Sequence, residues 1–184
     1  QRARPEQRGL IERTPRDVAL PLSFSQQRLW FLDQLEPVLA VYNVWVAWTL
    51  HGLLDGAAFE RAVAEIVRRH EVLRTHFSAI EGVPWQEIAA PETIAIEALE
   101  RPAGLDDSEW RALVEQRMTE LVKRPFQLAV GPLFRPTLAR IHDAEHVFCL
   151  IAHHTVFDGW SMGRFRFELA ELYAAYTAGR LPAL

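Results

Sequence analysis

The sequence has little cysteine, no excess of basic charge and no long hydrophobic run. Its 184 residues include one cysteine, Cys149, so no disulfide can form within the chain, and the apolar run 147–150 around it favours a small core residue in a reducing compartment. The formal net charge of −4 offers no basic face for nucleic acid. There is no secretory signal and no segment that could span a bilayer. We expect a soluble, cytoplasmic protein without nucleic-acid or membrane partners.

What the chain does have is the composition of a globular domain. It is 49% hydrophobic and 24% charged, and its length suits one domain with a sizeable core. Residues 1–17 are polar and interrupted by proline, which predicts a linker or leader, with the core beginning near Val18. Gln1 in place of a start methionine predicts an excised or processed fragment.

Four segments have the apolar spacing and start signals of helices. Three of them follow the N-cap residues Ser23, Asp55 and Asp106. Ser23 and Asp106 also have the spacing of a capping box, because Gln26 and Glu109 stand three residues after them. Pro37 must stop the first helix. A fourth helix is predicted from apolar residues three and four apart over residues 162–176.

Alternating apolar residues predict strands between these helices. The expected strands are residues 42–50, 73–77, 85–88, 94–99, 133–141 and 145–152. The last two are separated by a short polar turn, which indicates an antiparallel hairpin. Strands and helices interleave without a strict βαβ rhythm, which predicts a mixed α/β layer fold, a mixed sheet packed with helices.

Two adjacent histidines end the last predicted strand, and Asp158 and Gly159 follow at the entrance to a helix. Neighbouring residues of a strand point to opposite faces, so one histidine should face the core and the other a cleft. A neutral histidine with one ring nitrogen held by a hydrogen bond can take a proton from an amine or hydroxyl. A helix N-terminus stabilises nearby negative charge, and Gly159 lets a backbone amide approach a ligand.

The residues alone leave other interpretations open. A histidine beside an apolar strand is more often structural than catalytic, and no third ligand stands at a spacing that would support zinc. Asp158 fits a structural partner or a helix cap better than a catalytic acid, and Arg74 fits an exposed charge. Composition and spacing therefore indicate no more than an acyl-transfer or hydrolytic site.

Four segments together carry a family resemblance. The order His-His-x-x-x-Asp-Gly-Trp-Ser in residues 153–161 resembles the signature of the condensation domains of nonribosomal peptide synthetases. Residues 22–35 (LSFSQQRLWFLDQL), 69–77 (RHEVLRTHF) and 124–135 (RPFQLAVGPLFR) are similar to three further motifs of that family, in the family's order. Their joint occurrence is far more specific than the histidine motif alone.

The chain departs from the family pattern without losing either histidine, Asp158 or Gly159. The departures are Ser25 where Ala is usual, Gln127 where Asp is frequent, Ala152 where Met is common and Phe157 where Ser is common. The change at Phe157 leaves the stereochemical subtype open.

The resemblance implies a fold and a reaction. Residues 18–178 would be a single lobe, the N-terminal one, of a chloramphenicol acetyltransferase-like domain, and residues 179–184 would start the connection to a C-terminal lobe. Donor and acceptor peptidyl carrier proteins would bring phosphopantetheine-bound substrates to a tunnel between the lobes. The domain would transfer an acyl or peptidyl thioester to the amine of an aminoacyl thioester. The implied partners are these carriers, the second lobe and neighbouring synthetase domains, and the domain itself would hold no cofactor and no metal.

The resemblance also implies roles for individual residues. His154 would be the catalytic residue that orients or deprotonates the amine, and the Gly159 amide would lie near the thioester carbonyl. His153 would be structural, and Asp158 would hold the loop through an ion pair with Arg74. A single lobe lacks half of the tunnel, so we expect His154 to face solvent and the fragment to fold but to condense little.

Three rival functions remain to be distinguished. Epimerization domains carry a similar histidine pair but tend to have Trp where this chain has Met162. A coenzyme A-dependent acyltransferase of the same superfamily would use a hydroxyl acceptor, and the additional motifs argue against it. A non-catalytic lobe would only dock carrier or tailoring proteins.

Overall fold

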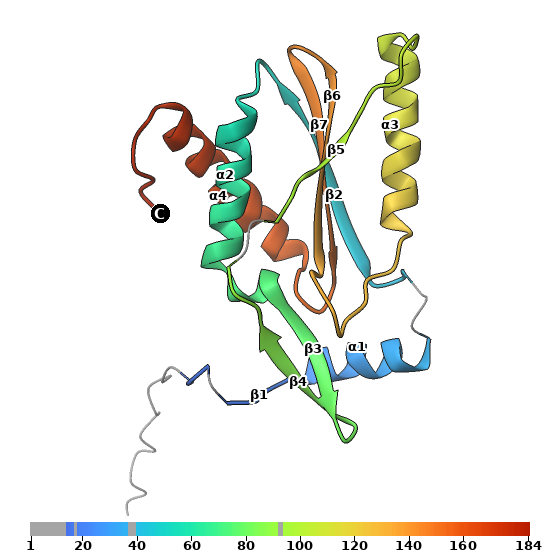
Figure 1. The fold of residues 1–184 in the computed structure, drawn as a ribbon, viewed down its shortest axis with the longest axis vertical. Coiled ribbons are helices and arrows are strands. Elements are labelled where there is room, and N and C mark those ends of the chain that lie inside the picture. Colours follow the sequence, from blue (N-terminus) through green and yellow to red (C-terminus); the bar gives the residue numbers. More distant parts are fainter. Residues whose placement is uncertain (1–13, 17, 37–39, 92–93) are drawn as a thin grey trace, which may run out of the picture.

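A computed structural model describes residues 14–16, 18–36, 40–91 and 94–184 of the chain. The predicted linker at residues 1–17 lies outside the described residues except for 14–16, and so does the predicted helix stop at Pro37. The described part is an elongated body with a four-stranded sheet at its centre and a smaller sheet at one end (Figure 1).

The larger sheet has the strand order β2-β7-β6-β5. Its strands are β2 (Asn43–His51), β5 (Glu97–Leu99), β6 (Phe134–His142) and β7 (Glu145–His153). Strands β6 and β7 form the predicted antiparallel hairpin, whereas β5 joins β6 in parallel. Helices cover both faces of β7, which explains the apolar run at residues 147–152. Cys149 is fully buried there, and burial raises the pKa of its thiol to about 11.

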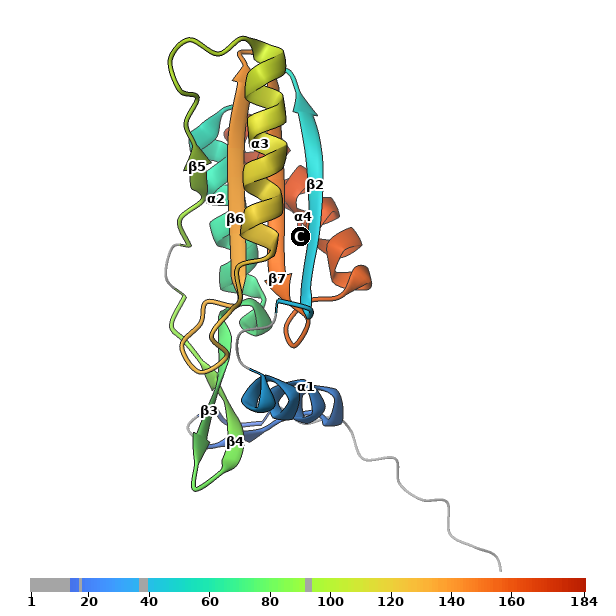
Figure 2. The same ribbon diagram turned by 90° about the vertical axis from the view of Figure 1, so that its right-hand side faces the viewer.

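Helices α2 (Gly56–Arg69) and α4 (Gly159–Thr177) cover one face of this sheet, and α3 (Asp107–Val122) covers the other (Figure 2). On the first face, the rings of Trp48 and Phe148 stack at 6.0 Å, and Phe165 of α4 stacks on both. On the second face, the indole N–H of Trp110 donates to the Arg140 carbonyl at 2.8 Å. The predicted caps of α2 and α3 are confirmed.

The smaller sheet has the order β1-β4-β3 and is antiparallel. Its strands are β1 (Leu20–Pro21), β3 (Thr75–Ile80) and β4 (Val83–Ile88). The sequence placed the start of β3 too early, because a 3-10 helix, η1 (Glu71–Arg74), comes first. The Leu73 amide donates to the His70 carbonyl, and the Thr75 hydroxyl donates to the Glu71 carbonyl, so hydrogen bonds of the turn replace those of a strand.

Helix α1 (Phe24–Leu35) lies across the end of the molecule next to the smaller sheet (Figure 1). Its predicted capping box is present, with Ser23 and Gln26 bonding each other's backbone amides. The apolar spacing located the helix correctly, yet α1 buries no residue, and Phe24 is 92% exposed. No helix in the described part of the chain is long and apolar enough to cross a membrane. The mixed α/β class is confirmed.

Candidate active site

The two histidines lie at the end of β7, where both backbone amides are held. The His153 N–H donates to the Leu133 carbonyl at 2.9 Å, and the His154 N–H donates to the Tyr42 carbonyl at 2.9 Å. The His153 side chain is buried, only 4% exposed, whereas His154 is exposed. One histidine therefore lies in the core, as predicted, and the other is exposed, as expected for a single lobe.

His153 is a neutral residue of the core. Its Nδ1 accepts a hydrogen bond from the backbone N–H of Thr155 at 3.3 Å. The Thr155 hydroxyl oxygen lies 2.9 Å from the same nitrogen. Because a backbone N–H only donates, Nδ1 is unprotonated and the proton resides on Nε2. Burial, helped by the charge of His154, lowers the pKa of His153 to about 4. The edge-on rings of Tyr42 and Phe126 complete its surroundings.

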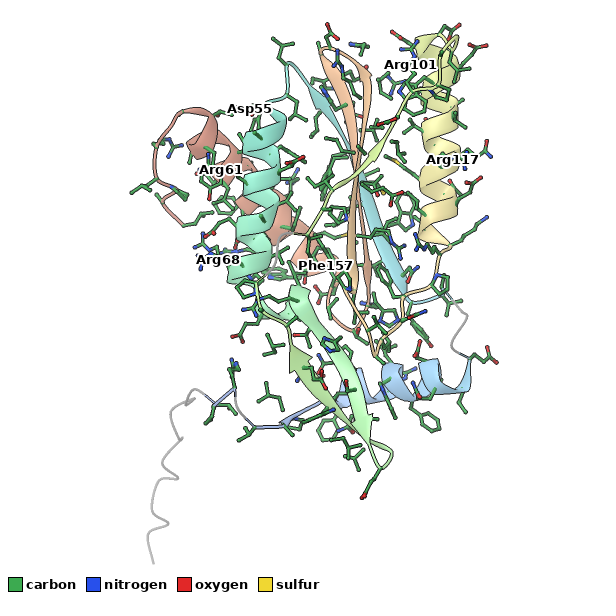
Figure 3. All side chains as sticks on the ribbon, in the orientation of Figure 1. Asp55, Arg61, Arg68, Arg101, Arg117 and Phe157 are labelled. Carbon is green, nitrogen blue, oxygen red and sulfur yellow. The ribbon has the colours of Figure 1, made fainter. Side chains whose placement is uncertain are left out.

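His154 has the opposite arrangement. Its Nδ1 lies 2.9 Å from the backbone carbonyl oxygen of Phe157, a residue near the first turn of α4 (Figure 3). A carbonyl oxygen only accepts, so Nδ1 donates and carries a proton. In the neutral ring the lone pair is then on Nε2, which is the form that a general base requires.

Asp158 and Gly159 form the start of α4. The Asp158 carboxylate caps the helix by accepting the Ser161 hydroxyl at 2.6 Å and the Ser161 N–H at 2.8 Å. These two bonds, with a smaller contribution from the charge of His154, hold the pKa of Asp158 below its ordinary value. A Cβ added to Gly159 would meet nothing within 4 Å, so the space on the side-chain side of this residue is open. The Gly159 amide belongs to the unpaired, positive end of α4.

The predicted ion pair between Asp158 and Arg74 is wrong. Asp158 serves its own helix, and Arg74 donates from Nη1 to the Ala89 carbonyl. No ion pair joins Arg74 and Asp158, both of which the structure describes. A helix start supplies N–H donors within one turn, so a short aspartate is satisfied locally and needs no distant partner.

Three supporting residues were not identified from the sequence. Ser161 stands at ordinary N-cap spacing from Asp158 and could have been found. Gln26 donates from α1 to the Thr155 carbonyl at 3.3 Å, a contact across 129 residues that no local pattern reveals. Thr155 fixes the His153 ring through its backbone and its hydroxyl.

A buried carboxylate ties α4 to the end of α2. Glu168 is 2% exposed, and its oxygens lie 2.8 Å from His70 Nε2 and 2.6 Å from Arg164 Nε. Burial alone would raise the pKa of Glu168, but the hydrogen bonds from His70 and Arg164 outweigh it and hold the pKa below its ordinary value. The helix that begins at Gly159 is thereby held in position from its middle.

The arrangement suits proton handling next to a site for negative charge. An exposed imidazole of fixed tautomer lies beside a helix start with a free approach, and a donor aimed at a developing oxyanion is typically worth roughly 3 kcal/mol of barrier. In the described ranges, no group of three or more His, Cys, Asp or Glu side chains is placed to hold a metal ion.

Comparison with known proteins shows the family to which the chain belongs. The sequence profile of one family, described as Condensation domain, matches residues 17–184. The chain is 43% identical over 171 residues to the isonitrile lipopeptide synthase of Mycobacterium tuberculosis, covering 91% of this chain and 6% of that protein. It is 44% identical over 170 residues to phosphinothricin tripeptide synthetase PhsC of Streptomyces viridochromogenes, covering 92% of this chain and 16% of that protein.

Solved structures show the same fold. The starter condensation domain of the rhizomide synthetase RzmA superposes with a TM-score of 0.83 at 26% identity, covering 91% of this chain and 40% of that one. The first condensation domain of the CDA synthetase gives 0.82 at 25% identity, covering 91% and 43%. The predicted chloramphenicol acetyltransferase-like fold is therefore confirmed. The chain spans a small part of its curated relatives and about two fifths of the solved domains.

Proposed function

Because the chain belongs to the condensation-domain family, we propose that residues 18–178 form the N-terminal lobe of a peptide-bond-forming condensation domain of a nonribosomal peptide synthetase. Residues 179–184 would begin the connection to a C-terminal lobe. The share of about 40% that the chain covers in solved condensation domains supports this division. The substrates are an acyl or peptidyl thioester and an aminoacyl thioester, each on the phosphopantetheine arm of a carrier protein.

His154 acts on the attacking amine. The amine nitrogen forms a bond to the thioester carbonyl carbon, the carbon–sulfur bond breaks, and the pantetheine thiolate leaves. The proton that the amine loses passes to Nε2 of His154 and from there to the leaving sulfur. Gly159 contributes a backbone N–H from the start of α4 toward the oxygen that becomes negative. His153, neutral and buried, keeps the strand end in place.

The single observation that carries this proposal is the bond from His154 Nδ1 to the Phe157 carbonyl. It fixes the ring with Nε2 outward, whether that nitrogen takes the proton or only orients the amine. A merely structural histidine would be buried in the core, as His153 is.

One comparison favours a second candidate, transfer from a coenzyme A ester. The starter condensation domain of RzmA has been solved as a variant with C8-CoA and Leu-SNAC. That protein is 26% identical to this chain. A donor on coenzyme A would use the same histidine, so only the carrier of the acyl group would differ.

The test is a condensation assay on the two-lobe protein with the His154→Ala substitution. We expect the turnover of carrier-bound donor and acceptor to fall by roughly 10²-fold or more, as for loss of a general base. The matched control is His51→Ala, an exposed histidine at the far end of β2. Unchanged turnover in the His154 variant would instead indicate a non-catalytic docking lobe. A parallel assay with an acyl-coenzyme A donor decides between the two donor classes.

A further inference from the structure

A groove of about 950 Å³ lies beside the first residues of β6. Strand β5 pairs with β6 only from Thr137 to Ala139, so the stretch 134–136 keeps an edge uncovered by β5 and lines the groove. The size is that of a small-molecule site. His154 and Gly159 do not line it, so the groove is distinct from the histidine site.

Three arginines line this groove, and two of them are held in place by backbone carbonyls. Arg74 donates from Nη1 to the Ala89 carbonyl, and Arg135 donates from Nη1 to the Leu121 carbonyl at 3.1 Å. The Arg135 guanidinium also lies over the Phe126 ring, 4.3 Å from its centre. Each guanidinium is thus fixed through Nη1, and no hydrogen bond within the described residues engages its Nη2.

The positive charge of the groove is not balanced by the described residues. No carboxylate of the described chain forms an ion pair with Arg74, Arg124 or Arg135. The Arg74 Nε is buried without a hydrogen-bond partner in that part of the chain. Leaving a buried charged donor unpaired is costly, and sites that tolerate this cost are often functional.

Burial and a second positive charge both act on Arg135. Burial lowers the pKa of Arg135, and the neighbouring charge of Arg124 lowers it further. Glu97 also lines the groove and partly offsets this through its own charge. His76 lines it too, but its Nε2 is already bonded to Glu87 at 2.9 Å. The balance at the groove remains positive.

We propose that this groove is a binding site for a phosphate group, held by Arg74, Arg124 and Arg135. The planar guanidinium fork binds two oxygens of a phosphate at once, and several forks that converge on one cavity suit a compact anion with many acceptors. The net charge of −4 argues against a nucleic-acid backbone as the source. The phosphate is either free or part of a larger ligand such as coenzyme A, which carries phosphate groups of the same chemistry.

The test titrates the chain with inorganic phosphate and, separately, with coenzyme A at constant ionic strength, using isothermal calorimetry. We expect binding to the unmodified chain and an affinity at least tenfold lower in Arg135→Gln and in Arg124→Gln. Arg166→Gln is the matched control, because Arg166 is exposed on α4 and does not line the groove. It should bind as the unmodified chain does.

Each outcome decides the proposal. If coenzyme A binds more tightly than phosphate, and the arginine variants lose affinity for both, the ligand extends beyond its phosphate group. If the two probes bind equally tightly, the ligand is free phosphate. No binding of either probe, or an equal loss in Arg166→Gln, overturns the site. Arg135 also holds the end of α3, so Arg124→Gln keeps the test valid if Arg135→Gln does not fold. None of these results depends on His154, so failure of the phosphate site would leave the proposed function standing.

Discussion

The adjacent histidines at the end of β7 differ in which ring nitrogen carries the proton. His153 accepts at Nδ1 from Thr155, and His154 donates from Nδ1 to Phe157. Strand alternation predicted from the sequence that one ring would be buried and the other exposed. It did not predict the tautomers, because these depend on backbone groups that the turn after β7 brings to each ring.

The buried His153 makes stability depend on pH. Its folded pKa of about 4 is below the ordinary 6.5, so the unfolded chain takes up the proton first as the pH falls. Stability is therefore complete above pH 6.5 and decreases toward pH 4, by about 3 kcal/mol in total. We expect urea unfolding to show about 2 kcal/mol of this loss between pH 6.5 and pH 5, before most carboxylates titrate.

Substitution of His153 should flatten this slope. In His153→Gln no proton can be taken up at this position, so the free energy of unfolding should change much less between pH 6.5 and 5. The lowered pKa of His146, also due mainly to burial, leaves a residual slope of the same sign. His51→Gln, at an exposed position, should keep the full slope. An equal slope in both variants would show that His153 is not the titrating group.

At the scale of the element, α1 is the helix whose stability depends least on burial. Its periodic apolar residues Phe24, Phe31 and Leu35 are all more than half exposed. Gln26 instead connects it twice, to the Ser23 amide in the capping box and to the Thr155 carbonyl beside the histidines. A helix held by polar contacts at its first turn should open locally more readily than α2, which buries six residues.

Removal of the Gln26 side chain should loosen α1 selectively. We expect Gln26→Ala to speed amide hydrogen exchange throughout α1, while the free energy of global unfolding changes by no more than about 1 kcal/mol. Gln34→Ala, near the exposed end of the same helix, serves as the control and should leave exchange in the first turn unchanged. If α1 of the unmodified chain exchanges as slowly as α2, or if Gln26→Ala leaves exchange in α1 unchanged, the polar contacts at the first turn do not limit the stability of α1.

Element positions were predictable where local chemistry dictates them. Caps at Ser23, Asp55 and Asp106 fixed three helix starts, and the polar turn after β6 fixed the hairpin. The 3-10 turn before β3 was missed because Leu73 and Thr75 are both buried, and two buried residues at this spacing do not distinguish a strand from a turn. The Asp158–Arg74 pair was mispredicted for a related reason, since local donors took the carboxylate.

At the scale of the whole molecule, the sheet order depends on long-range pairing that no local pattern specifies. Strand β1 pairs with β4, with Leu20 opposite Gln86, and β5 adds to β6 in parallel over three residues. Helix α1 lies across the molecular end that carries the histidine loop (Figure 1). Sequence motifs indicated the family and also contain the three groove arginines, in residues 69–77 and 124–135, but no local pattern shows that these two segments line one groove.

The exposed apolar face of α1 should cause the chain to associate with itself. Phe24 and Phe31 are seven residues apart and Leu35 follows four later, so they share one helix face. We expect sedimentation analysis to show association that increases with concentration and weakens in the double variant Phe31→Ser, Leu35→Ser. Val83→Ser, an equally exposed position on the β3–β4 hairpin, is the control and should associate as before. A chain that stays monomeric at every concentration would contradict this.

The position of Cys149 has a practical consequence for biophysical work. The thiol is buried in the central strand with its pKa raised to about 11, so at neutral pH it is neither ionised nor accessible to maleimide reagents. A cysteine introduced at an exposed site such as Arg166 would then be the sole reactive thiol of the folded chain. Fluorophores or spin labels could be attached there without first removing the native sulfur, and labelling of Cys149 would itself report unfolding.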